Sequence, residues 1–250
     1  MNKKEITEGL LKARYAHRGL HTKPEIPENS MHAFRLAVED GYGIELDVHL
    51  TSDNKLAVIH DPSLKRTAGV DLVIEDITLE KAQEFYLEAS QERIPDFEDV
   101  LKVVSGKIPL IIELKTEGGN TDALCTRMMQ ALEGYEGLYC IESFDPSVVK
   151  WLRHNAPQVV RGQLAGHLRR GGDCNIKRSH DFLLKTLLVN FMGGKPDFVA
   201  YKYEDIDSIP FRLFSGAKFT WTIKSYEDLR KAEARGIPGI FEQFNPKDYE

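Results

Sequence analysis

The 250-residue sequence predicts an α/β fold, a (β/α)8 TIM barrel with a small insertion after the second strand. Short apolar runs alternate with helical patterns along the chain, which is typical of parallel strands joined by crossover helices. Eight principal apolar runs are present, and eight repeats in a chain of this length favour a closed barrel over an open sheet. Charged residues stand at the ends of several runs, where the active site of such a barrel lies.

Each strand is predicted from a short run rich in aliphatic or aromatic residues. The eight strands are expected at residues 13–17, 43–48, 109–114, 138–142, 159–164, 197–201, 218–222 and 239–242. A further short strand at 56–59 follows the polar turn at 51–54 and is not counted among the eight.

Helices are predicted where apolar residues recur every three or four positions behind a capping residue. Asn29 or Ser30 caps the first of them, which ends at Asp40-Gly41, and Asp145-Pro146 begins another with proline in its first turn. The others are expected from Thr78, from Asp96, over 124–132, near 181–192, near 205–213 and over 225–235.

The predicted insertion is a polar excursion at residues 61–95. It interrupts the alternation of strands and helices directly after the second strand and its short companion. No linker, internal repeat or low-complexity segment divides the sequence, so residues 1–250 are expected to form a single domain.

Composition and charge exclude several classes of function. The net charge of −6 gives no support for nucleic-acid binding, which normally needs a basic surface. No apolar run approaches the roughly 20 residues of a membrane span, so stable membrane insertion is not expected. Residues 1–12 are charged and lack the apolar stretch of a signal peptide, which predicts a cytoplasmic protein. The protein is separately expected to be a monomer or a homodimer. Cys125 and Cys140 lie in apolar segments and are expected to be reduced, whereas Cys174 lies in a polar stretch.

Three carboxylates at strand ends are candidate metal ligands. Glu45 and Asp47 are two positions apart on one strand and therefore face the same way, and Glu113 ends the next principal strand. A carboxylate among apolar residues is costly unless it is paired or bound to a metal. Three oxygen ligands suit one divalent cation, Mg²⁺ or Ca²⁺, and the sequence has no Cys cluster that would favour zinc. The alternative is that these acids only form ion pairs with Arg18 and Lys115.

His17 and His60 are candidate acid–base residues. An imidazole titrates near pH ~6.5, so one histidine can act as a base while the other acts as an acid. Each stands at a strand end beside a charged neighbour, Arg18 or Asp61. The remaining histidines are assigned to ordinary hydrogen-bonded structural roles: His21, His32, His49, His154, His167 and His180.

Arg18 and Lys115 are the candidate anion-binding residues. Arginine offers a planar fork of donors that matches phosphate oxygens, and lysine offers a compact charge. Together they predict a phosphate or carboxylate on the substrate. Glu28 and Asn29 precede the first helix, and their simplest role is to cap it.

The order of these motifs resembles that of the glycerophosphodiester phosphodiesterases, which are TIM barrels with an insertion after the second strand. The residues that carry the resemblance are His17-Arg18-Gly19, Pro27-Glu28-Asn29-Ser30, Glu45-Leu46-Asp47-Val48, His60-Asp61-Pro62 and Ile112-Glu113-Leu114-Lys115. Further matches are Leu64-Lys65-Arg66-Thr67, Ile94 to Leu101, Ser143-Phe144-Asp145-Pro146 and Trp221-Thr222-Ile223, so the resemblance covers essentially the whole chain.

The resemblance implies a metal-dependent hydrolysis of a small phosphodiester, such as glycerophosphocholine or glycerophosphoethanolamine, to sn-glycerol-3-phosphate and an alcohol. By this resemblance, the cation is bound by Glu45, Asp47 and Glu113, and the general base and acid are His17 and His60. The phosphate is held by Arg18 and Lys115. Glu28, with Asn29 beside it, supports the metal or histidine shell, and Trp221 lines the pocket near the glycerol. Two positions depart from the family pattern. Ile240-Phe241-Glu242 stands where many members of the family carry Thr-Asp-x-Pro after the last strand, and Glu142 stands where a neutral residue is expected.

Other functions fit the same sequence features. A phospholipase of the C or D type acting on lysophospholipids would share the barrel, the histidines and the carboxylates. A non-catalytic barrel that binds a phosphodiester or a lipid headgroup is a second alternative, and a lyase or aldolase with Lys115 as a Schiff base is a third. The basic stretch at 166–172 with Lys177-Arg178 either attracts an anionic headgroup or is a solvated loop.

Overall fold

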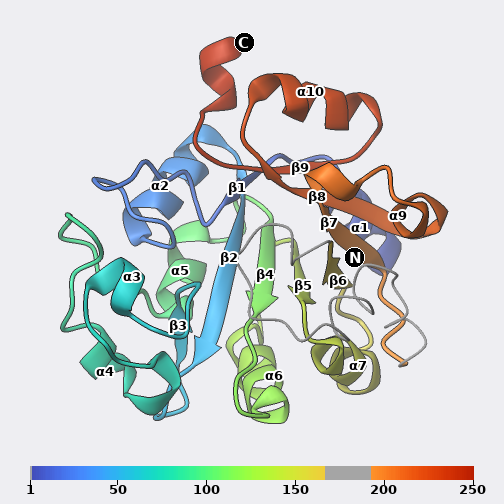
Figure 1. Cartoon of the computed structure of the whole chain (residues 1–250). Coiled ribbons are helices and arrows are strands. Elements are labelled where there is room, and N and C mark those ends of the chain that lie inside the picture. Colours follow the sequence, from blue (N-terminus) through green and yellow to red (C-terminus); the bar gives the residue numbers. More distant parts are fainter. Residues whose placement is uncertain (1, 167–192) are drawn as a thin grey trace.

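The computed structural model describes residues 2–166 and 193–250. Eight parallel strands form a closed barrel in the order β1-β9-β8-β7-β6-β5-β4-β2, and the pairing of β1 with β2 completes the circle (Figure 1). The strands are β1 (Tyr15–His17), β2 (Gly43–Leu50), β4 (Leu110–Leu114), β5 (Tyr139–Ser143), β6 (Arg161–Ala165), β7 (Phe198–Lys202), β8 (Ala217–Ile223) and β9 (Gly239–Phe241). The short β3 (Leu56–Val58) is antiparallel to β2 and lies outside the barrel. The predicted TIM barrel is confirmed.

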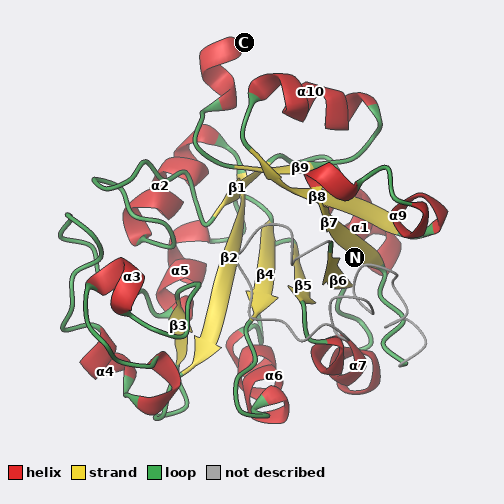
Figure 2. Cartoon of the chain, in the orientation of Figure 1, coloured by secondary structure: helices red, strands yellow, loops and turns green. Residues whose placement is uncertain are grey.

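Helices cover the outside of this barrel (Figure 2). The longer ones are α1 (Lys3–Leu10), α2 (Met31–Asp40), α5 (Phe97–Val104), α6 (Thr121–Ala131), α7 (Pro146–Asn155), α9 (Ile209–Leu213) and α10 (Tyr226–Ala234). Short 3-10 turns occupy Tyr203–Asp205 and Pro246–Tyr249. The caps expected for α2 and α7 are present, since the Ser30 side chain accepts from the amide of Ala33 and Asp145 accepts from the amide of Ser147.

Two helices differ from the prediction. The helix expected near 205–213 begins only at Ile209, because Pro210 is tolerated in the first turn of a helix and not in its interior. The helix expected from Thr78 is a single turn, α4 (Leu79–Ala82). The helix predicted near 181–192 lies outside the described residues.

Helix α1 closes the N-terminal end of the barrel and was not predicted. Its last residue, Leu10, is completely buried against the apolar side chains that fill the barrel. The Tyr15 hydroxyl, inside the barrel, donates to the carbonyl of Leu10 at 2.8 Å. Residues 1–12 carry many charges, so the helix was not recognised from the few apolar positions that make this contact.

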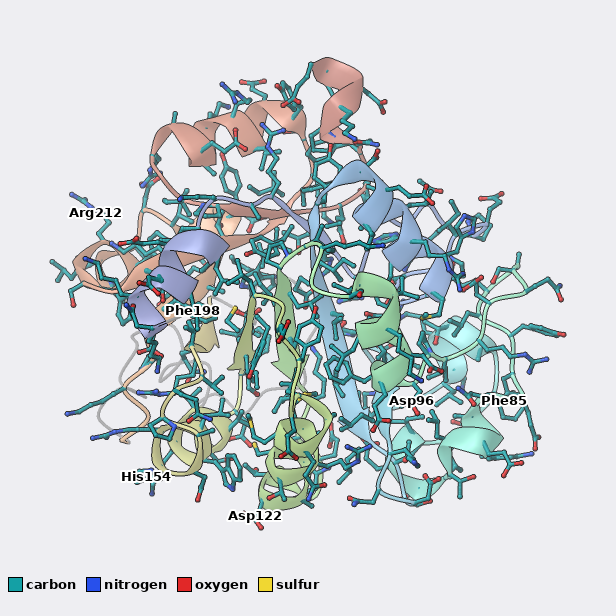
Figure 3. All side chains as sticks on the ribbon, turned by 180° about the vertical axis from the view of Figure 1, so that it is seen from behind. Phe85, Asp96, Asp122, His154, Phe198 and Arg212 are labelled. Atoms are coloured by element: carbon teal, nitrogen blue, oxygen red, sulfur yellow. The ribbon has the colours of Figure 1, made fainter. Side chains whose placement is uncertain are left out.

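Two apolar layers fix the direction in which each strand side chain points. One cluster fills the barrel itself and includes Tyr15, Ile111, Cys140, Phe198 and Phe219. The other lies between the strands and the surrounding helices. Because side chains alternate along a strand, the residue two positions after an interior one also faces the interior. Phe198 lies at the barrel in Figure 3, while His154 and Asp122 lie at the periphery.

The insertion lies beside β2 and has its own small core. It contains α3 (Lys65–Ala68), a 3-10 turn at Ile74–Asp76, and α4. The apolar side chains of this core are Ala57, Ile59, Leu64, Ile74, Leu79, Ala82, Leu87 and Ile94. The insertion therefore follows the second strand, as the sequence predicted, and it brings residues 60–66 to the C-terminal end of the barrel.

Two expectations from composition can be compared with the described part of the chain. None of its helices combines the length and the apolar character that a membrane span requires. Cys125 and Cys140 are buried free thiols, as expected. Cys174 lies outside the described residues.

Candidate active site

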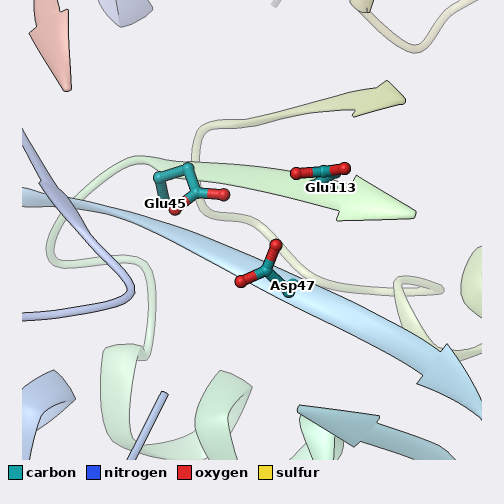
Figure 4. Close-up of side chains that lie close together, drawn as sticks. All are labelled: Glu45, Asp47 and Glu113. Atoms are coloured by element: carbon teal, nitrogen blue, oxygen red, sulfur yellow. The ribbon is translucent and has the colours of Figure 1, made fainter. Parts of the chain in front are cut away.

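Three carboxylates lie close together on the inner side of β2 and β4 (Figure 4). Glu45 and Asp47 come from β2 and Glu113 from β4, and one oxygen of each lies within 4.8 Å of the others. Their flanking residues Ile44 and Ile112 belong to the outer apolar layer, so the alternation of the strands turns the acids inward. The acids are only 3%, 1% and 6% exposed. The arrangement predicted from the sequence is present.

Burial of like charges shifts the pKa of these acids in opposite directions. Burial and the neighbouring Asp47 raise the pKa of Glu45 well above its usual value. Burial also raises the pKa of Glu113, to about 7, although Lys115 opposes this. Burial would raise the pKa of Asp47 as well, but Lys115, His60 and Arg18 outweigh it and lower that pKa. A bound cation would relieve the repulsion between these groups.

Lys115 and Arg18 contact the acids directly. The Lys115 ammonium lies 2.7 Å from Glu113 and 3.0 Å from Asp47. Arg18 Nε lies 3.3 Å from Asp47, and the Arg18 backbone amide donates to Glu45 at 3.1 Å. Burial would lower the pKa of Lys115, yet Asp47 and Glu113 hold it above its usual value. A lysine kept protonated is a poor nucleophile, so this geometry does not support a Schiff base on Lys115.

Glu142 is a fourth carboxylate in the barrel interior. It lies on β5 directly opposite Glu113 and is 1% exposed. Its Oε2 has no hydrogen-bond partner among the described residues. Burial and Glu113 raise its pKa well above the usual value. Glu142 therefore joins the acidic group, and it does not form a separate ion pair within the described chain.

The acidic group fits a divalent cation. Glu45, Asp47, Glu113 and Glu142 are four buried acids. Within the described residues, the side chains of Arg18 and Lys115 contact Asp47, Lys115 contacts Glu113, and Glu45 accepts from the backbone amide of Arg18. Carboxylate oxygens are the ligands that Mg²⁺ and Ca²⁺ prefer. Glu45, Asp47 and Glu113 could hold such an ion, with Glu142 beside them.

His17 is held by a carboxylate that the sequence did not identify as a functional residue. Its Nδ1 lies 2.7 Å from Oε2 of Glu242, which follows β9, and its Nε2 lies 3.8 Å from Glu45. Burial and Arg18 lower the pKa of His17, while Glu242 opposes them. The pKa of Glu242 is about 2, because His17 and Lys224 outweigh the effect of burial. The one signal in the sequence was that Glu242 ends the last predicted strand, at 239–242, and this strand pairs with the first when the barrel closes.

His60 is oriented by a chain of charged residues from the insertion. Its Nδ1 lies 2.6 Å from Asp61, and Arg66 Nε donates to the other oxygen of Asp61 at 2.6 Å. Arg66 also donates to Glu28 at 2.6 Å, and Glu28 accepts from Arg18 at 2.7 Å. Burial and Lys115 lower the pKa of His60 to about 4. The chain thus links the orientation of His60 to that of Arg18.

Glu28 and Asn29 do not cap a helix, so the simplest expectation for them was wrong. Ser30 is the N-cap of α2, which leaves the two preceding side chains free to face the barrel mouth. Glu28 also pairs with Lys23, and its three cationic partners hold its pKa well below the usual value against the effect of burial. Asn29 Nδ2 donates to Asp47 at 2.9 Å. Both residues support the charged site.

The other histidines fall into different environments. His49 has the structural role expected of it, since its ring contacts Glu75 and the carbonyl of His60. His154 and His32 are exposed. His21 is buried, but neither ring nitrogen has a hydrogen-bond partner among the described residues, so the expectation of a hydrogen-bonded residue was wrong for His21. Burial and His17 lower its pKa to about 4, which keeps the ring neutral. His167 and His180 lie outside the described residues.

Trp221 lies on β8, across the barrel from the acids. Phe219, two positions earlier, is part of the barrel interior, so Trp221 faces the mouth. Its indole nitrogen donates to the carbonyl of Ala200 at 3.1 Å, and its ring contacts Phe144 edge to face at 5.6 Å. The structure thus places every predicted site residue at one end of the barrel. The basic stretch at 167–172 and Lys177-Arg178 lies outside the described residues.

The fold and this site define a TIM barrel with a histidine pair, buried acids and anion-binding cations at its C-terminal end. Residues 17–184 match the glycerophosphoryl diester phosphodiesterase family. The chain is 41% identical over 249 residues to a glycerophosphodiester phosphodiesterase of Bacillus altitudinis, covering 92% of this chain and 94% of that one. It is 30% identical over 247 residues to one of Caldanaerobacter subterraneus, covering 90% and 91%.

Solved structures with low sequence identity share the fold. A phosphodiesterase of Oleispira antarctica, solved in complex with the product sn-glycerol-3-phosphate, has a TM-score of 0.78 at 19% identity and covers 96% of each chain. A glycerophosphodiester phosphodiesterase of Thermotoga maritima has a TM-score of 0.68 at 24% identity, with 92% and 93% covered. The chain belongs to the glycerophosphoryl diester phosphodiesterase family, and its enzyme class is that of the glycerophosphodiester phosphodiesterases.

Proposed function

We propose that this enzyme hydrolyses the glycerophosphodiesters left by deacylation of phospholipids, such as glycerophosphocholine and glycerophosphoethanolamine, to sn-glycerol-3-phosphate and an alcohol. The observation that carries the proposal is the convergence of two carboxylate-bound histidines, His17 and His60, on one group of buried acids and cations. Family membership supports the phosphodiester substrate, and the bound product of the Oleispira antarctica structure supports its glycerol portion.

His17 is the proposed general base. The Glu242 carboxylate accepts a hydrogen bond from the N–H at Nδ1, so the neutral ring presents an unprotonated Nε2 to the mouth. The low pKa of His17 keeps it neutral at pH 7, which is the state that a base requires. Nε2 then removes the proton of the oxygen that attacks phosphorus.

His60 is the proposed general acid. Asp61 accepts from its Nδ1, so the proton to be donated is carried on Nε2. The pKa of His60 is about 4 in the free protein, because Lys115 adds to the effect of burial. An anionic phosphodiester beside the ring raises that pKa and favours the protonated form. The proton then passes to the oxygen of the departing alcohol.

Arg18 and Lys115 are the proposed phosphate-binding residues, and Glu45, Asp47 and Glu113 are the proposed ligands of one Mg²⁺ or Ca²⁺ ion. When bound, the cation supplies a Lewis acid that withdraws charge from the phosphoryl oxygens. Arg18 and Lys115 stabilise the charge that builds on the same oxygens in the transition state. Their existing contacts with Asp47 hold both side chains in place before substrate arrives.

The first test measures release of sn-glycerol-3-phosphate from glycerophosphocholine and glycerophosphoethanolamine with EDTA, Mg²⁺ or Ca²⁺. Turnover should need a divalent cation and should be lost in His17→Ala and Glu45→Ala, while the exposed His154→Ala remains as active as wild type. No turnover of either diester by folded, metal-loaded protein would exclude this substrate class. Lysophospholipids would then be the next substrates to test.

A second test separates the two histidines. With bis(p-nitrophenyl) phosphate the departing p-nitrophenolate needs no proton, so a missing general acid matters less. The activity of His60→Ala, as a fraction of the wild-type activity on the same substrate, should therefore be much higher for bis(p-nitrophenyl) phosphate than for glycerophosphocholine. For His17→Ala this fraction should be low on both substrates. If instead His17→Ala were the variant that regains activity, His17 would be the general acid and His60 the general base.

A further inference from the structure

One cation at the mouth of the barrel has no place in the proposed mechanism. Lys202 is the last residue of β7, and Phe198 and Ala200 of the same strand face the barrel interior. Alternation therefore turns Lys202 inward at the C-terminal end. Its ammonium lies 5.7 Å from the centre of the Trp221 ring.

Lys202, Trp221 and Phe144 together form one side of the mouth, which we call the aromatic wall. Trp221 packs edge to face on Phe144 and is fixed by its bond to the carbonyl of Ala200. In the strand order, β7 and β8 lie directly across the barrel from β2 and β4, which carry the acids. A diester whose phosphate lies at Arg18 and Lys115 extends toward this wall.

Lys202 differs from the other cations of the site in having no acidic partner within the described chain. Arg18 and Lys115 each contact two carboxylates, and Lys224 contacts Glu242 at 3.2 Å. No carboxylate lies within ion-pair distance of Lys202 in residues 2–166 and 193–250, so its three N–H donors are available. A half-buried ammonium with only an aromatic face beside it is suited to receive oxygen atoms from a ligand.

The side chains of the aromatic wall indicate which kind of ligand group it binds. The exposed parts of the Trp221 and Phe144 rings offer apolar surface to C–H groups, and the ammonium donates to hydroxyl or anionic oxygens, which together match a polyol. A quaternary ammonium would also seek the indole face, but Lys202 already occupies that position and repels a second cation. The wall therefore favours an oxygen-rich, uncharged group over choline.

We propose that Lys202 is a substrate-binding residue that makes the aromatic wall a subsite for a polyol portion of the diester. This inference rests on the proposed function. The polyol can come from the glycerol that all glycerophosphodiesters share, or from the departing alcohol when that alcohol is itself a polyol.

The test compares Lys202→Met, which keeps the length of the side chain and removes its donors, with Lys202→Arg, which keeps them. Lys218→Met is the matched control, because the Lys218 ammonium also lies near an aromatic ring, 5.5 Å from that of Phe211, yet away from the mouth. The substrates are glycerophosphocholine, glycerophosphoglycerol and bis(p-nitrophenyl) phosphate, which has no polyol.

A hydrogen bond to a charged group corresponds to a loss of about ten- to a hundredfold, so KM for glycerophosphoglycerol should rise by that factor in Lys202→Met and recover in Lys202→Arg. The effect on bis(p-nitrophenyl) phosphate should be at least about tenfold smaller. If the wall holds the shared glycerol, KM for glycerophosphocholine rises equally. If it holds the departing alcohol, KM for glycerophosphocholine does not rise.

Equal losses on all three substrates, or no loss beyond that of Lys218→Met, would overturn the proposal. If the wild-type enzyme hydrolyses no glycerophosphodiester, the proposed function fails first, and the subsite is tested by binding alone. Quenching of tryptophan fluorescence by sn-glycerol-3-phosphate and by glycerophosphoglycerol should then still weaken in Lys202→Met. If Lys202→Met binds both ligands as tightly as wild type, the proposed subsite is refuted as well.

Discussion

Replacing Glu242 by glutamine tests whether the carboxylate on His17 contributes to turnover. The substitution keeps the shape of the side chain and removes its charge. In the structure this carboxylate accepts from Nδ1 of His17 at 2.7 Å and is only 13% exposed. The amide of glutamine can instead present its N–H₂ group to Nδ1, which would favour the tautomer that carries the proton on Nε2. The base would then face the substrate with its proton in the wrong place.

The expected loss follows from the strength of this contact. A hydrogen bond to a charged group contributes about 1.5–3 kcal/mol, which corresponds to a fall in kcat of about ten- to a hundredfold. The pKa of His17 should also fall further in this variant. Burial and Arg18 lower this pKa, and the substitution removes the charge of Glu242, which opposes them. A base is active when unprotonated, so activity is lost as the pH falls through this pKa. The acid limb of kcat/KM should therefore move to lower pH in Glu242→Gln.

The assay is the pH profile of kcat/KM on glycerophosphocholine, with thermal unfolding as a check on folding. Glu227→Gln is the matched control, because it makes the same chemical change on an exposed residue of α10, whose one ion pair within the described chain is with Lys231. That variant should stay within about twofold of wild type, as is usual for exposed ion pairs. A kcat for Glu242→Gln within twofold of the control, with an unmoved acid limb, would refute the role given to this carboxylate.

Three further predictions concern the surroundings of the site. Arg66→Met removes the bridge between Asp61 and Glu28, so kcat/KM should fall about three- to tenfold in steady-state kinetics, as expected for a half-exposed ion pair. An unchanged kcat/KM would mean that His60 is oriented without Arg66. His21 has a pKa of about 4 when folded and near 6.5 when unfolded, so the folded state binds fewer protons and stability decreases as the pH falls between these values. His21→Phe should reduce the loss of unfolding free energy between pH 7 and pH 5 by about 2 kcal/mol in urea titrations, and an equal loss in both proteins would contradict this. Gly162→Ala should lower the unfolding free energy by about 1–3 kcal/mol in thermal melts, because its Cβ would lie 2.1 Å from the Phe198 ring, and an unchanged melting temperature would show that the ring moves aside.

The barrel could be predicted because its signals are local. Each strand shows as a run of a few apolar residues, and each helix as a period of three to four with a cap, as at Ser30 and Asp145. The same local rule placed Glu45 and Asp47 on one face, because a strand alternates its side chains. Charges at strand ends then indicated the site, since the C-terminal ends of barrel strands lie together.

The partners of those charges could not be predicted, because they depend on the closure and register of the barrel. Glu242 meets His17 across 225 positions of sequence only because β9 pairs with β1. Arg66 reaches Glu28 because the insertion folds back against the barrel mouth. Glu28 faces Arg18 and does not cap α2, and no local pattern distinguishes these two roles.

Periodicity within single elements was therefore enough to predict the class of fold, the end of the barrel at which the site lies and the residue types in it. Three features depend on how the strands come together in the barrel: the carboxylate that holds His17, the position of Glu142 beside the buried acids, and the position of Lys202 at the mouth without an acidic partner in the described chain. These contacts join strands that are distant in sequence. Their geometry is set by strand pairing and packing around the whole barrel, to which residues far from the site contribute.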